Sequence, residues 1–459
     1  MAATESSKWK FVDNHLGLLS FLVTTLFVVS IWVLRFIKGN PVLFGEDIYN
    51  ALILFSRVVA LFSEMQVRGV ILAVSLALTG FGISCLAYVV QYHIESKWMK
   101  RAIMGLVSIT PAFISASASF SKTLIVFVFC IFILFCLTKI SEDEKKKLAT
   151  NAEDQKSLPS RRVKILYVVL SLIFSFLLGM LSLFAVIFVV LVWYIYLRRN
   201  ATHLYLILSS FVGSILAYFL SLPLWNGTIS IPEVISDFGA PQGIGVMVVL
   251  LAILSILFWD KQWSTRSLLI TVPLGALLLF DSSVRLLFFL VIIVLAARTW
   301  EELFFQGWAL PLVRRMSILV VGLSFAFSML VFIDRAPTFS PTLEEHAALA
   351  FVAAYTPLSV SIFSEPSQAA YVRYYTKRTP VVHSEIDREY YEKVINSAYI
   401  KEAVPNLEER GVNVLYFSSS MMQNLPSDQR LRFLLTNERF KMLYLGNTTQ
   451  AWMFLSRQQ

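Results

Sequence analysis

The chain has 459 residues, of which 57% are hydrophobic and 15% are charged, and its mean hydropathy is +0.69. Soluble domains carry about 25% charged residues, so this composition excludes an ordinary soluble enzyme and predicts a polytopic α-helical membrane protein. The formal net charge of +9 does not indicate nucleic-acid binding. Much of the excess lies in short loops between apolar segments, where Lys and Arg set the membrane orientation.

The apolar pattern stops near Arg335, and beyond it charged residues, Pro, Tyr and Ser return at ordinary density. We therefore predict a membrane domain at residues 1–334 and a C-terminal α/β domain at residues 335–459. Because a membrane-spanning helix needs about 20 apolar residues, we expect about eleven of them. Two blocks, 163–197 and 265–298, could each be one long apolar segment. The expected spans are 16–37, 69–92, 100–117, 122–139, 163–181, 183–197, 203–222, 243–259, 265–280, 285–298 and 315–334.

Cation-rich loops alternate with cation-poor loops along the membrane domain. Cation-rich loops face the cytoplasm, so the N-terminus, with Lys8 and Lys10, is expected there. The loop after the first span and the C-terminal domain are then extracytoplasmic. Four basic residues near span ends are exceptions, because they are expected on the extracytoplasmic side. They either snorkel to the membrane surface or bind an anionic group. They are Arg35, Lys38, Arg57 and Arg68.

The C-terminal domain alternates short strand patterns with helical ones. No nucleophile or metal motif is recognisable in it, so we expect a structural or acceptor-binding role. Strands are expected at 354–362, 379–382, 412–417, 441–444 and 451–455, and helices at 365–376, 388–400, 401–410 and 427–437.

An acidic pair follows the first span in the segment Pro41–Asn50 (PVLFGEDIYN). Carboxylates at a membrane surface are costly to keep near lipid, which makes them functional candidates. Asp47, with Glu46 beside it, could deprotonate an acceptor in an extracytoplasmic reaction. The alternative is that Asp47 only caps the N-terminus of a helix running from Ile48 to about Phe62.

Further candidates lie in two later external segments. Arg285, like Arg35, could stabilise a departing phosphate, although a pair formed by Asp281 and Arg285 four residues apart on a helix would neutralise itself. The long loop 225–243 carries Glu233 and Asp237, which could contact substrate or simply be solvated.

No metal site is predicted, because the five His residues are scattered without metal-ligand spacing. We predict no cofactor from the residues, and a divalent cation, Mg²⁺ or Mn²⁺, is left open.

The arrangement resembles the GT-C superfamily of integral-membrane glycosyltransferases, which includes oligosaccharyltransferase catalytic subunits and protein O-mannosyltransferases. It looks most like a divergent prokaryotic branch, the archaeal one included. Pro41–Asn50 is similar to the family's first external loop, and the resemblance implies that Asp47 is the catalytic acid residue. Ile109–Thr123 is similar to the family's segment that joins the third and fourth spans. Ser230–Gly245 looks like a loop with a mobile Glu-bearing motif, which matches Glu233 here. Ser364–Pro380 resembles the start of the family's external domain.

The chain departs from the oligosaccharyltransferase pattern in two places. Ser115–Lys122 contains no carboxylate, whereas those enzymes carry metal-binding acids between the third and fourth spans. The Trp-Trp-Asp-Tyr-Gly acceptor motif is also absent from this sequence. Both departures argue against sequon-directed N-glycosylation and favour a metal-independent transfer.

The predicted function is therefore transfer of a sugar from a polyprenyl-phosphate-linked donor to a glycan, lipid or protein acceptor on the extracytoplasmic face of the cell membrane. Asp47 and Glu46 are the expected catalytic residues, and Arg35, Arg285, Glu233 and Asp237 are the expected substrate contacts. The partners are the donor, the acceptor and the lipid bilayer, without nucleic acid. Two alternatives are a flippase or transporter for a lipid-linked glycan and a non-catalytic membrane assembly subunit.

Overall fold

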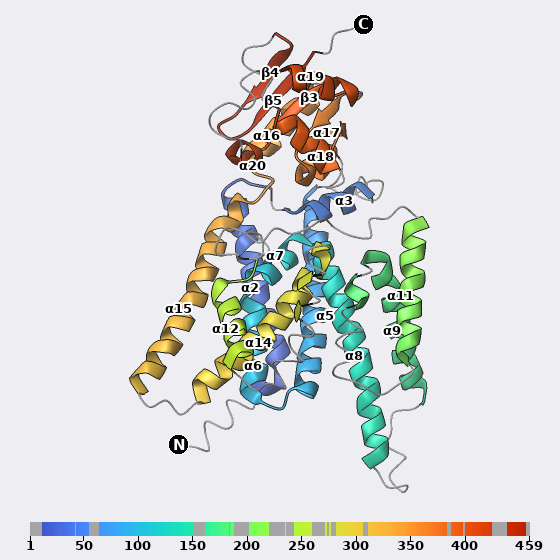
Figure 1. Cartoon of the computed structure of the whole chain (residues 1–459), viewed down its shortest axis with the longest axis vertical. Helices are drawn as coiled ribbons and strands as arrows, with labels where there is room; N and C mark the ends of the chain where they lie inside the picture. Colours follow the sequence, from blue (N-terminus) through green and yellow to red (C-terminus); the bar gives the residue numbers. More distant parts are fainter. Residues whose placement is uncertain are drawn as a thin grey trace. The chain divides into compact units, whose positions relative to one another are not determined.

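The chain folds into two compact units in the computed structural model (Figure 1). Unit 1 comprises Met1–Ile31 and Val70–Ala336, and unit 2 comprises Trp32–Gly69 and Pro337–Gln459. Unit 2 therefore adds the segment around the first external loop to the C-terminal tail, a grouping that the sequence did not predict. The structure describes residues 12–41, 43–54, 64–149, 161–182, 184–187, 202–219, 235, 243–258, 271–272, 275–276, 281–305, 311–382, 387–397, 400–424 and 438–455.

Unit 1 is built from long apolar helices. Two of its helices, α2 and α5, extend into unit 2 at one end. The helices are α2 (Leu16–Ile37), α5 (Glu64–His93), α6 (Lys97–Ile109), α7 (Pro111–Ser119), α8 (Lys122–Ala149), α9 (Arg161–Leu181), α11 (Thr202–Phe219), α12 (Val246–Phe258), the 3₁₀ turn η4 (Ser282–Val284), α14 (Arg285–Phe305) and α15 (Pro311–Arg335).

Among the described residues, six helices are long and apolar enough to cross a membrane, or seven if α6 and α7 form one bent span. The described parts of α11 and α12 are shorter apolar helices. The protein is thus a multi-pass membrane protein, as predicted. The expected number of eleven is not confirmed, and the expected spans 183–197 and 265–280 lie mostly outside the described residues.

The expected span at 100–117 falls on α6 and α7, a pair of helices with a break at Pro111. α6 ends at Ile109 and α7 begins at Pro111, with a bend of 51° between them. Thr110 between them is extended, with φ −72° and ψ 123°. Proline has no N–H to continue the helix, and its ring disfavours helical geometry in the preceding residue. The segment Ile109–Thr123 thus contains the buried helix α7, which follows this break.

Helices α9 and α11 approach each other closely through two glycines. A Cβ on Gly179 would collide with the Ser210 carbonyl group, and a Cβ on Gly213 would collide with that of Phe176. The close approach lets the Ser214 hydroxyl donate to the Gly179 carbonyl at 2.8 Å. Small residues at such contacts and inter-helix hydrogen bonds are the main sources of helix association in lipid.

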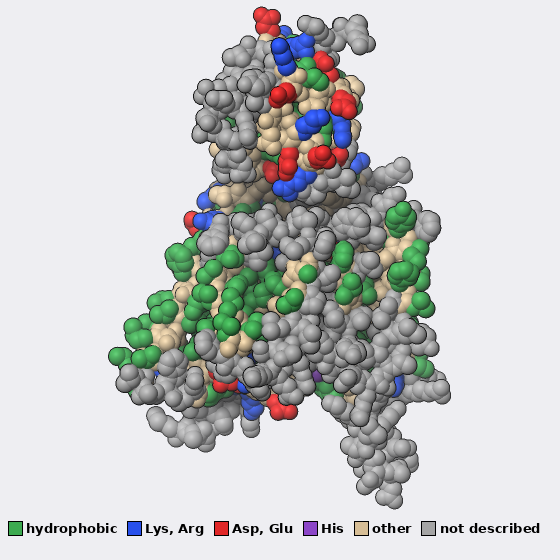
Figure 2. Space-filling view, in the orientation of Figure 1, with side chains coloured by type: hydrophobic (Ala, Val, Ile, Leu, Met, Phe, Trp, Pro, Cys, Tyr) green, Lys and Arg blue, Asp and Glu red, His purple; other side chains and the backbone are tan. Residues whose placement is uncertain are grey.

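The outer surface of unit 1 is apolar. Hydrophobic side chains cover the visible faces of α11, α12 and α15, whereas Lys, Arg, Asp and Glu are prominent on the tail of unit 2 (Figure 2). On α15, Leu323, Phe327 and Leu330 are each at least 60% exposed. An exposed surface of this kind matches a lipid environment rather than water.

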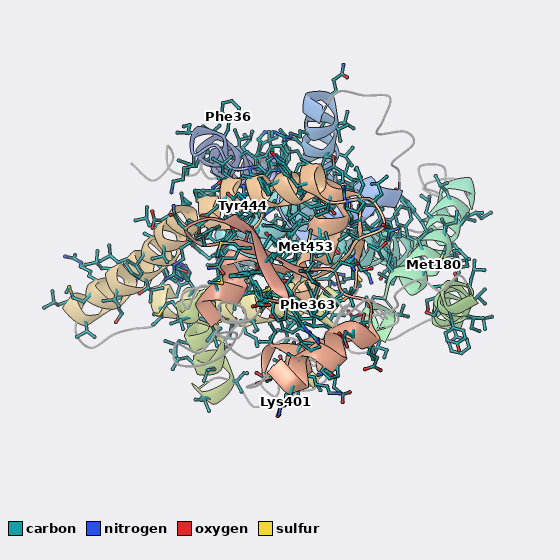
Figure 3. The ribbon with its side chains drawn as sticks, turned by 90° about the horizontal axis from the view of Figure 1, so that it is seen from above. Phe36, Met180, Phe363, Lys401, Tyr444 and Met453 are labelled. Carbon is teal, nitrogen blue, oxygen red and sulfur yellow. The ribbon has the colours of Figure 1, made fainter. Side chains whose placement is uncertain are left out.

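Unit 2 contains a five-stranded mixed sheet with the strand order β2-β1-β3-β5-β4. The strand β1 pairs in parallel with β2 and β3, whereas β5 pairs antiparallel with β3 and β4. Seen from above, Phe363 on β1 and Met453 on β5 lie near the middle of the tail, and Lys401 lies at its rim (Figure 3). The strands are β1 (Ser361–Phe363), β2 (Thr379–Pro380), β3 (Val414–Phe417), β4 (Phe440–Leu445) and β5 (Gln450–Phe454).

All five strands fall within or next to the predicted segments, but the first is shorter than expected. Ala354 and Tyr355 belong to a helix because Thr342 and Glu345 form a capping box that starts it. That helix and α20 were not predicted, and the expected helix 427–437 lies outside the described residues. The helices of unit 2 are α3 (Glu46–Leu54), α16 (Leu343–Tyr355), α17 (Ala369–Thr376), α18 (Arg388–Ile395), α19 (Ile400–Glu409) and α20 (Ser419–Asn424), with 3₁₀ turns η5 (Ala336–Thr338) and η6 (Pro366–Gln368).

A buried carboxylate connects α16 with α20. Glu345 is 1% exposed, and one of its oxygens accepts hydrogen bonds from the Thr342 amide and the Ser340 hydroxyl. The other oxygen accepts from the amide of Ser419 at 3.2 Å and from its hydroxyl at 2.5 Å. Four donors compensate the cost of burying this charge.

We expect Gly213→Ala to lower the stability of unit 1, because the added methyl group would overlap the backbone of α9. Overpacking of this kind costs about 1–3 kcal/mol, and it would appear as a lower melting temperature of the purified protein in detergent. Gly322→Ala is the matched control, since nothing lies within 4 Å of a Cβ there. Equal melting temperatures for the two variants would contradict the close contact between α9 and α11.

Candidate active site

The acidic pair begins helix α3 in unit 2. Gly45 precedes the helix with φ +95°, which glycine adopts without strain. Asp47 is half-buried, whereas Ile48 and Tyr49, which follow it, are buried. The helix starts at Glu46, so Asp47 lies in its first turn and not at the cap position that the alternative interpretation required. Carboxylates are favoured there by the partial positive charge of the helix N-terminus.

Arg35, at the last turn of α2, is fully buried. Its Nε donates to the Pro41 carbonyl at 2.8 Å, and its two terminal nitrogens donate to the carbonyls of Phe339 at 2.6 Å and Pro341 at 2.9 Å. A longer bond of 3.4 Å reaches Pro337. The guanidinium also lies over the Phe44 ring, 4.9 Å from its centroid. This geometry favours a structural role for Arg35 over the predicted contact with a donor phosphate.

The Arg35 bonds connect the first external loop with the chain that follows α15. Asn40 adds a second connection, because its Nδ2 donates to the Pro337 carbonyl at 2.6 Å and its Oδ1 accepts from the Leu343 amide at 2.8 Å. The loop that carries the acidic pair is therefore bound to the start of the tail through Asn40, and Arg35 just before it adds bonds to both segments.

Three tyrosines of α17 hold the helix of the acidic pair through Tyr49. The ring of Tyr49 lies 4.7 Å from that of Tyr371, 5.1 Å from that of Tyr374 and 5.5 Å from that of Tyr375. Its hydroxyl donates to the Leu43 carbonyl at 3.1 Å and lies 2.7 Å from the Tyr375 hydroxyl. The Gly45 amide donates to the Tyr371 hydroxyl at 3.1 Å. These contacts fix α3 against the tail.

Burial raises the pKa of Tyr49 well above its ordinary value near 10, and the neighbouring Tyr375 adds to this effect. The phenol is therefore neutral at physiological pH and can donate its hydrogen bond.

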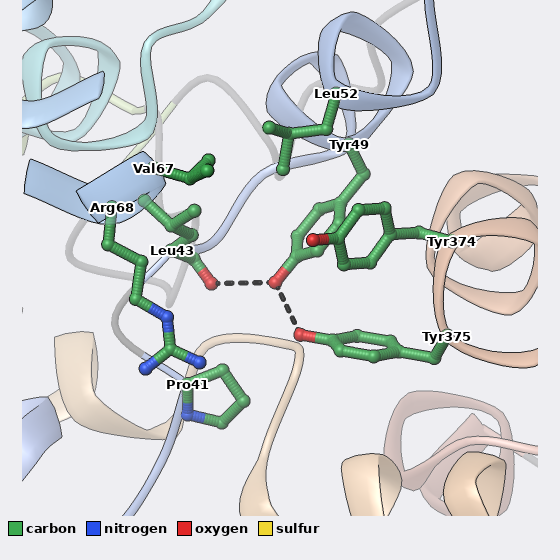
Figure 4. Close-up of a pocket in the computed structure, with 8 residues that line it drawn as sticks. All are labelled: Pro41, Leu43, Tyr49, Leu52, Val67, Arg68, Tyr374 and Tyr375. Carbon is green, nitrogen blue, oxygen red and sulfur yellow. Dashed lines mark hydrogen bonds between the residues drawn. The ribbon is translucent and has the colours of Figure 1, made fainter. Parts of the chain in front are cut away.

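A small pocket lies beside this tyrosine cluster (Figure 4). It has about 260 Å³ of empty space, including the space open to solvent at its mouth. Arg68 and Pro41 line one side, and Tyr374 and Tyr375 line the other. Asp47, two residues before Tyr49 on α3, is not among the residues that line this pocket.

The remaining predicted residues lie elsewhere. Of the predicted residues that the structure describes, Arg285 starts α14 in unit 1, whereas Arg35, Glu46 and Asp47 belong to unit 2. Glu233 and Asp237 lie outside the described residues.

Asp281 is fully buried in unit 1, where it caps the 3₁₀ turn before α14. It accepts hydrogen bonds from the Ser283 amide at 2.9 Å and from the hydroxyls of Ser283 and Ser182, each at 2.6 Å. The alternative considered from the sequence was an ion pair with Arg285, and the structure adds serine donors that the sequence did not suggest.

Within the described part of the chain, no group of three or more His, Cys, Asp or Glu side chains is arranged to hold a metal ion. The tyrosine cluster was missed from the sequence, although its signal is present in the spacing. Tyr371, Tyr374 and Tyr375 are three and four residues apart, which places them on one face of a helix.

No protein-family model matches the chain, and no curated protein matches its sequence. Solved structures do resemble it. The archaeal oligosaccharyltransferase AglB from Archaeoglobus fulgidus, in complex with an inhibitory peptide and a dolichol-phosphate, aligns with a TM-score of 0.54 and 11% identity, covering 89% of this chain and 70% of that one. The Archaeoglobus fulgidus oligosaccharyltransferase tethered to an acceptor peptide aligns with a TM-score of 0.51 and 10% identity, covering 90% and 70%.

This chain shares its fold with that archaeal oligosaccharyltransferase. The resemblance to GT-C membrane glycosyltransferases that the sequence predicted is confirmed at the level of the fold. The alignment covers most of this chain, so the similarity is not confined to the membrane helices.

We expect Arg35→Lys to destabilise unit 2, because an ammonium group cannot reach the several carbonyls that the planar guanidinium binds. Loss of these charged hydrogen bonds should cost about 2–4 kcal/mol, measured as a lower melting temperature in detergent. Lys38→Arg, at an exposed position three residues later, should leave the melting temperature unchanged. If both variants melt like the parent protein, the buried guanidinium does not hold the loop.

Tyr49→Phe should change how stability depends on alkaline pH. Because the pKa of Tyr49 is raised in the folded state, the unfolded chain ionises first, and the free energy of unfolding falls as pH rises above about 10. The Phe variant should lose about 1 kcal/mol at pH 7 and show a shallower decline between pH 9.5 and 11. Melting curves at several pH values test this, with Tyr218→Phe, exposed on α11, as the control. Parallel pH profiles for the parent and Tyr49→Phe would contradict it.

Proposed function

We propose that this protein is a membrane glycosyltransferase that moves a sugar from a polyprenyl-phosphate-linked donor to an acceptor hydroxyl. The observation that carries the proposal is the placement of Asp47, a half-buried carboxylate on a helix held by the tail, in a chain with the oligosaccharyltransferase fold. The archaeal structure was obtained with a dolichol-phosphate and a peptide, which supports a lipid-linked donor and a separate acceptor.

In the proposed reaction, the acceptor oxygen attacks the anomeric carbon of the donor sugar. The bond between that carbon and the phosphate oxygen breaks, and the polyprenyl phosphate leaves with the electron pair. Asp47 accepts the proton of the acceptor hydroxyl, and Glu46, beside it in the sequence, is the second proposed catalytic residue. A positioned general base of this kind contributes about 10²–10⁴-fold to the rate, and positioning of the reactants contributes on the order of 7–11 kcal/mol.

The leaving phosphate requires a cation. Arg285, at the start of α14, remains our candidate, whereas the guanidinium of Arg35 is bound to backbone carbonyls. Glu233 and Asp237 remain predicted substrate contacts. The proposed topology places the N-terminus in the cytoplasm and the tail outside, because the cation-rich loops are then cytoplasmic. We assign no cofactor, and the assay below, run with EDTA and then with Mg²⁺ or Mn²⁺, measures any requirement for a divalent cation.

We expect Asp47→Asn to lower kcat for sugar transfer by about 10²–10⁴-fold, with an unchanged melting temperature. The assay follows the release of polyprenyl phosphate from a radiolabelled polyprenyl-phosphate sugar by the purified protein in lipid nanodiscs. Asn50→Ala, exposed on the same helix, is the matched control and should retain full activity. Glu46→Gln should have a smaller effect than Asp47→Asn.

Full turnover by Asp47→Asn would remove Asp47 from the mechanism. A parent protein that translocates the lipid-linked sugar without consuming it would instead support the flippase alternative, and one that does neither would support the assembly-subunit alternative.

A further inference from the structure

Helix α16 of the tail is apolar on the side that faces away from the unit. Its exposed residues form a stripe at helical spacing, and none of them is polar or charged. They are Leu343, Ala347, Ala350, Ala354 and Tyr355. Leu343 and Tyr355 are 52% and 67% exposed, and Leu358, just beyond the helix, is 71% exposed.

The opposite side of the same helix is already buried in the unit. Ala348, Leu349 and Val352 are fully buried, and Glu345 is occupied by its four hydrogen bonds. The helix is therefore hydrophobic on both sides. A helix of this kind in a soluble domain is covered all round, and an uncovered apolar side indicates contact with lipid or with another protein.

The stripe continues onto neighbouring side chains of the tail. The ring of Phe351 stacks on that of Tyr355 at 4.2 Å and lies 5.8 Å from that of Tyr444 on strand β4. Leu445, the next residue on this edge strand, is 61% exposed. Glu344 fixes the helix against the same hairpin, because it accepts hydrogen bonds from the Thr448 amide at 2.7 Å and the Thr448 hydroxyl at 2.8 Å.

The first residue of α16 lies against the end of the first membrane span. The Leu343 amide donates to Asn40, and a Cβ on Gly39 would lie 3.5 Å from the Leu343 side chain. The last turn of α2, which carries Arg35, exposes Phe36 by 66% and Ile37 by 72%. Phe36 and Tyr444 lie on the same side of unit 2 when it is viewed from above (Figure 3).

We propose that the exposed face of α16 lies in the interfacial layer of the lipid bilayer and anchors the tail to the membrane. The occupant is lipid because Leu343, the first residue of the stripe, lies beside Gly39, just after the exposed Phe36 and Ile37 at the end of α2. Aromatic rings such as those of Phe351 and Tyr355 are suited to this layer, where their flat apolar faces meet a partly hydrated environment. The exposed Lys38 at the end of α2 is placed to meet lipid headgroups. This inference does not depend on the proposed reaction.

Spin labels on the full-length protein in proteoliposomes test the proposal. Cys85, Cys130 and Cys136 are free and buried, so a cysteine introduced at an exposed site is the preferred point of labelling. We would label Ala350→Cys and Tyr355→Cys, with Ala347→Cys as a further position on the stripe. Glu389→Cys, exposed on α18, is the aqueous control.

Collision with dissolved oxygen and with a water-soluble nickel chelate distinguishes the occupants. We expect the ratio of oxygen to nickel accessibility at residues 350 and 355 to exceed that at residue 389 by about tenfold, because oxygen partitions into the hydrocarbon and the chelate does not. A high nickel accessibility at these positions would show that the stripe faces water and would overturn the proposal. Low accessibility to both reagents would show that a protein, such as a second copy of this chain, covers it, which would also overturn the lipid assignment.

Discussion

The hydrogen bonds of the buried Arg35 guanidinium to backbone carbonyls hold the two segments of unit 2 together. Arg35 stands at the end of the first span and binds the carbonyls of Pro41, Phe339 and Pro341. These carbonyls belong to two chain segments that are about 300 residues apart in the sequence. A buried cation without such bonds would cost several kcal/mol, so the guanidinium and the carbonyls stabilise one another only when both segments are in place. The first external loop and the start of the tail consequently form one structure.

The consequence for the candidate active site is that the acidic helix is attached to the tail and not merely to the membrane domain. It is attached in two ways. Arg35 at the end of α2 and Asn40 in the loop bind the chain before the helix to the start of the tail, and the tyrosine cluster packs against the buried Tyr49. The acidic helix is thus supported through Tyr49 and through the loop that precedes it. A rigid support of this kind limits the movement of the helix relative to a substrate, which the proposed role of Asp47 requires.

Unit 1 shows how the membrane environment shapes the remainder of the chain. With lipid on the outside, burial of apolar surface cannot drive helix association, and close contacts such as those of Gly179 with Ser210 and of Gly213 with Phe176 take over that role. The buried Asp281 is acceptable there because serine hydroxyls and an amide donate to it. The fold similarity to the archaeal oligosaccharyltransferase spans both this helical unit and most of the tail.

Local sequence patterns predicted the membrane class, the positions of most described helices, segments within or next to all five tail strands, and the helical start at the acidic pair. These features follow from local patterns of hydrophobicity and turn residues, which neighbouring residues decide. The tertiary structure decided which distant segments meet. Arg35 looked like a surface cation because nothing near it in sequence supplies the carbonyls around residue 340 that bind it. The tyrosines of α17 likewise acquired their role only when α3 packed against them, and the apolar face of α16 became visible only once its other side was buried.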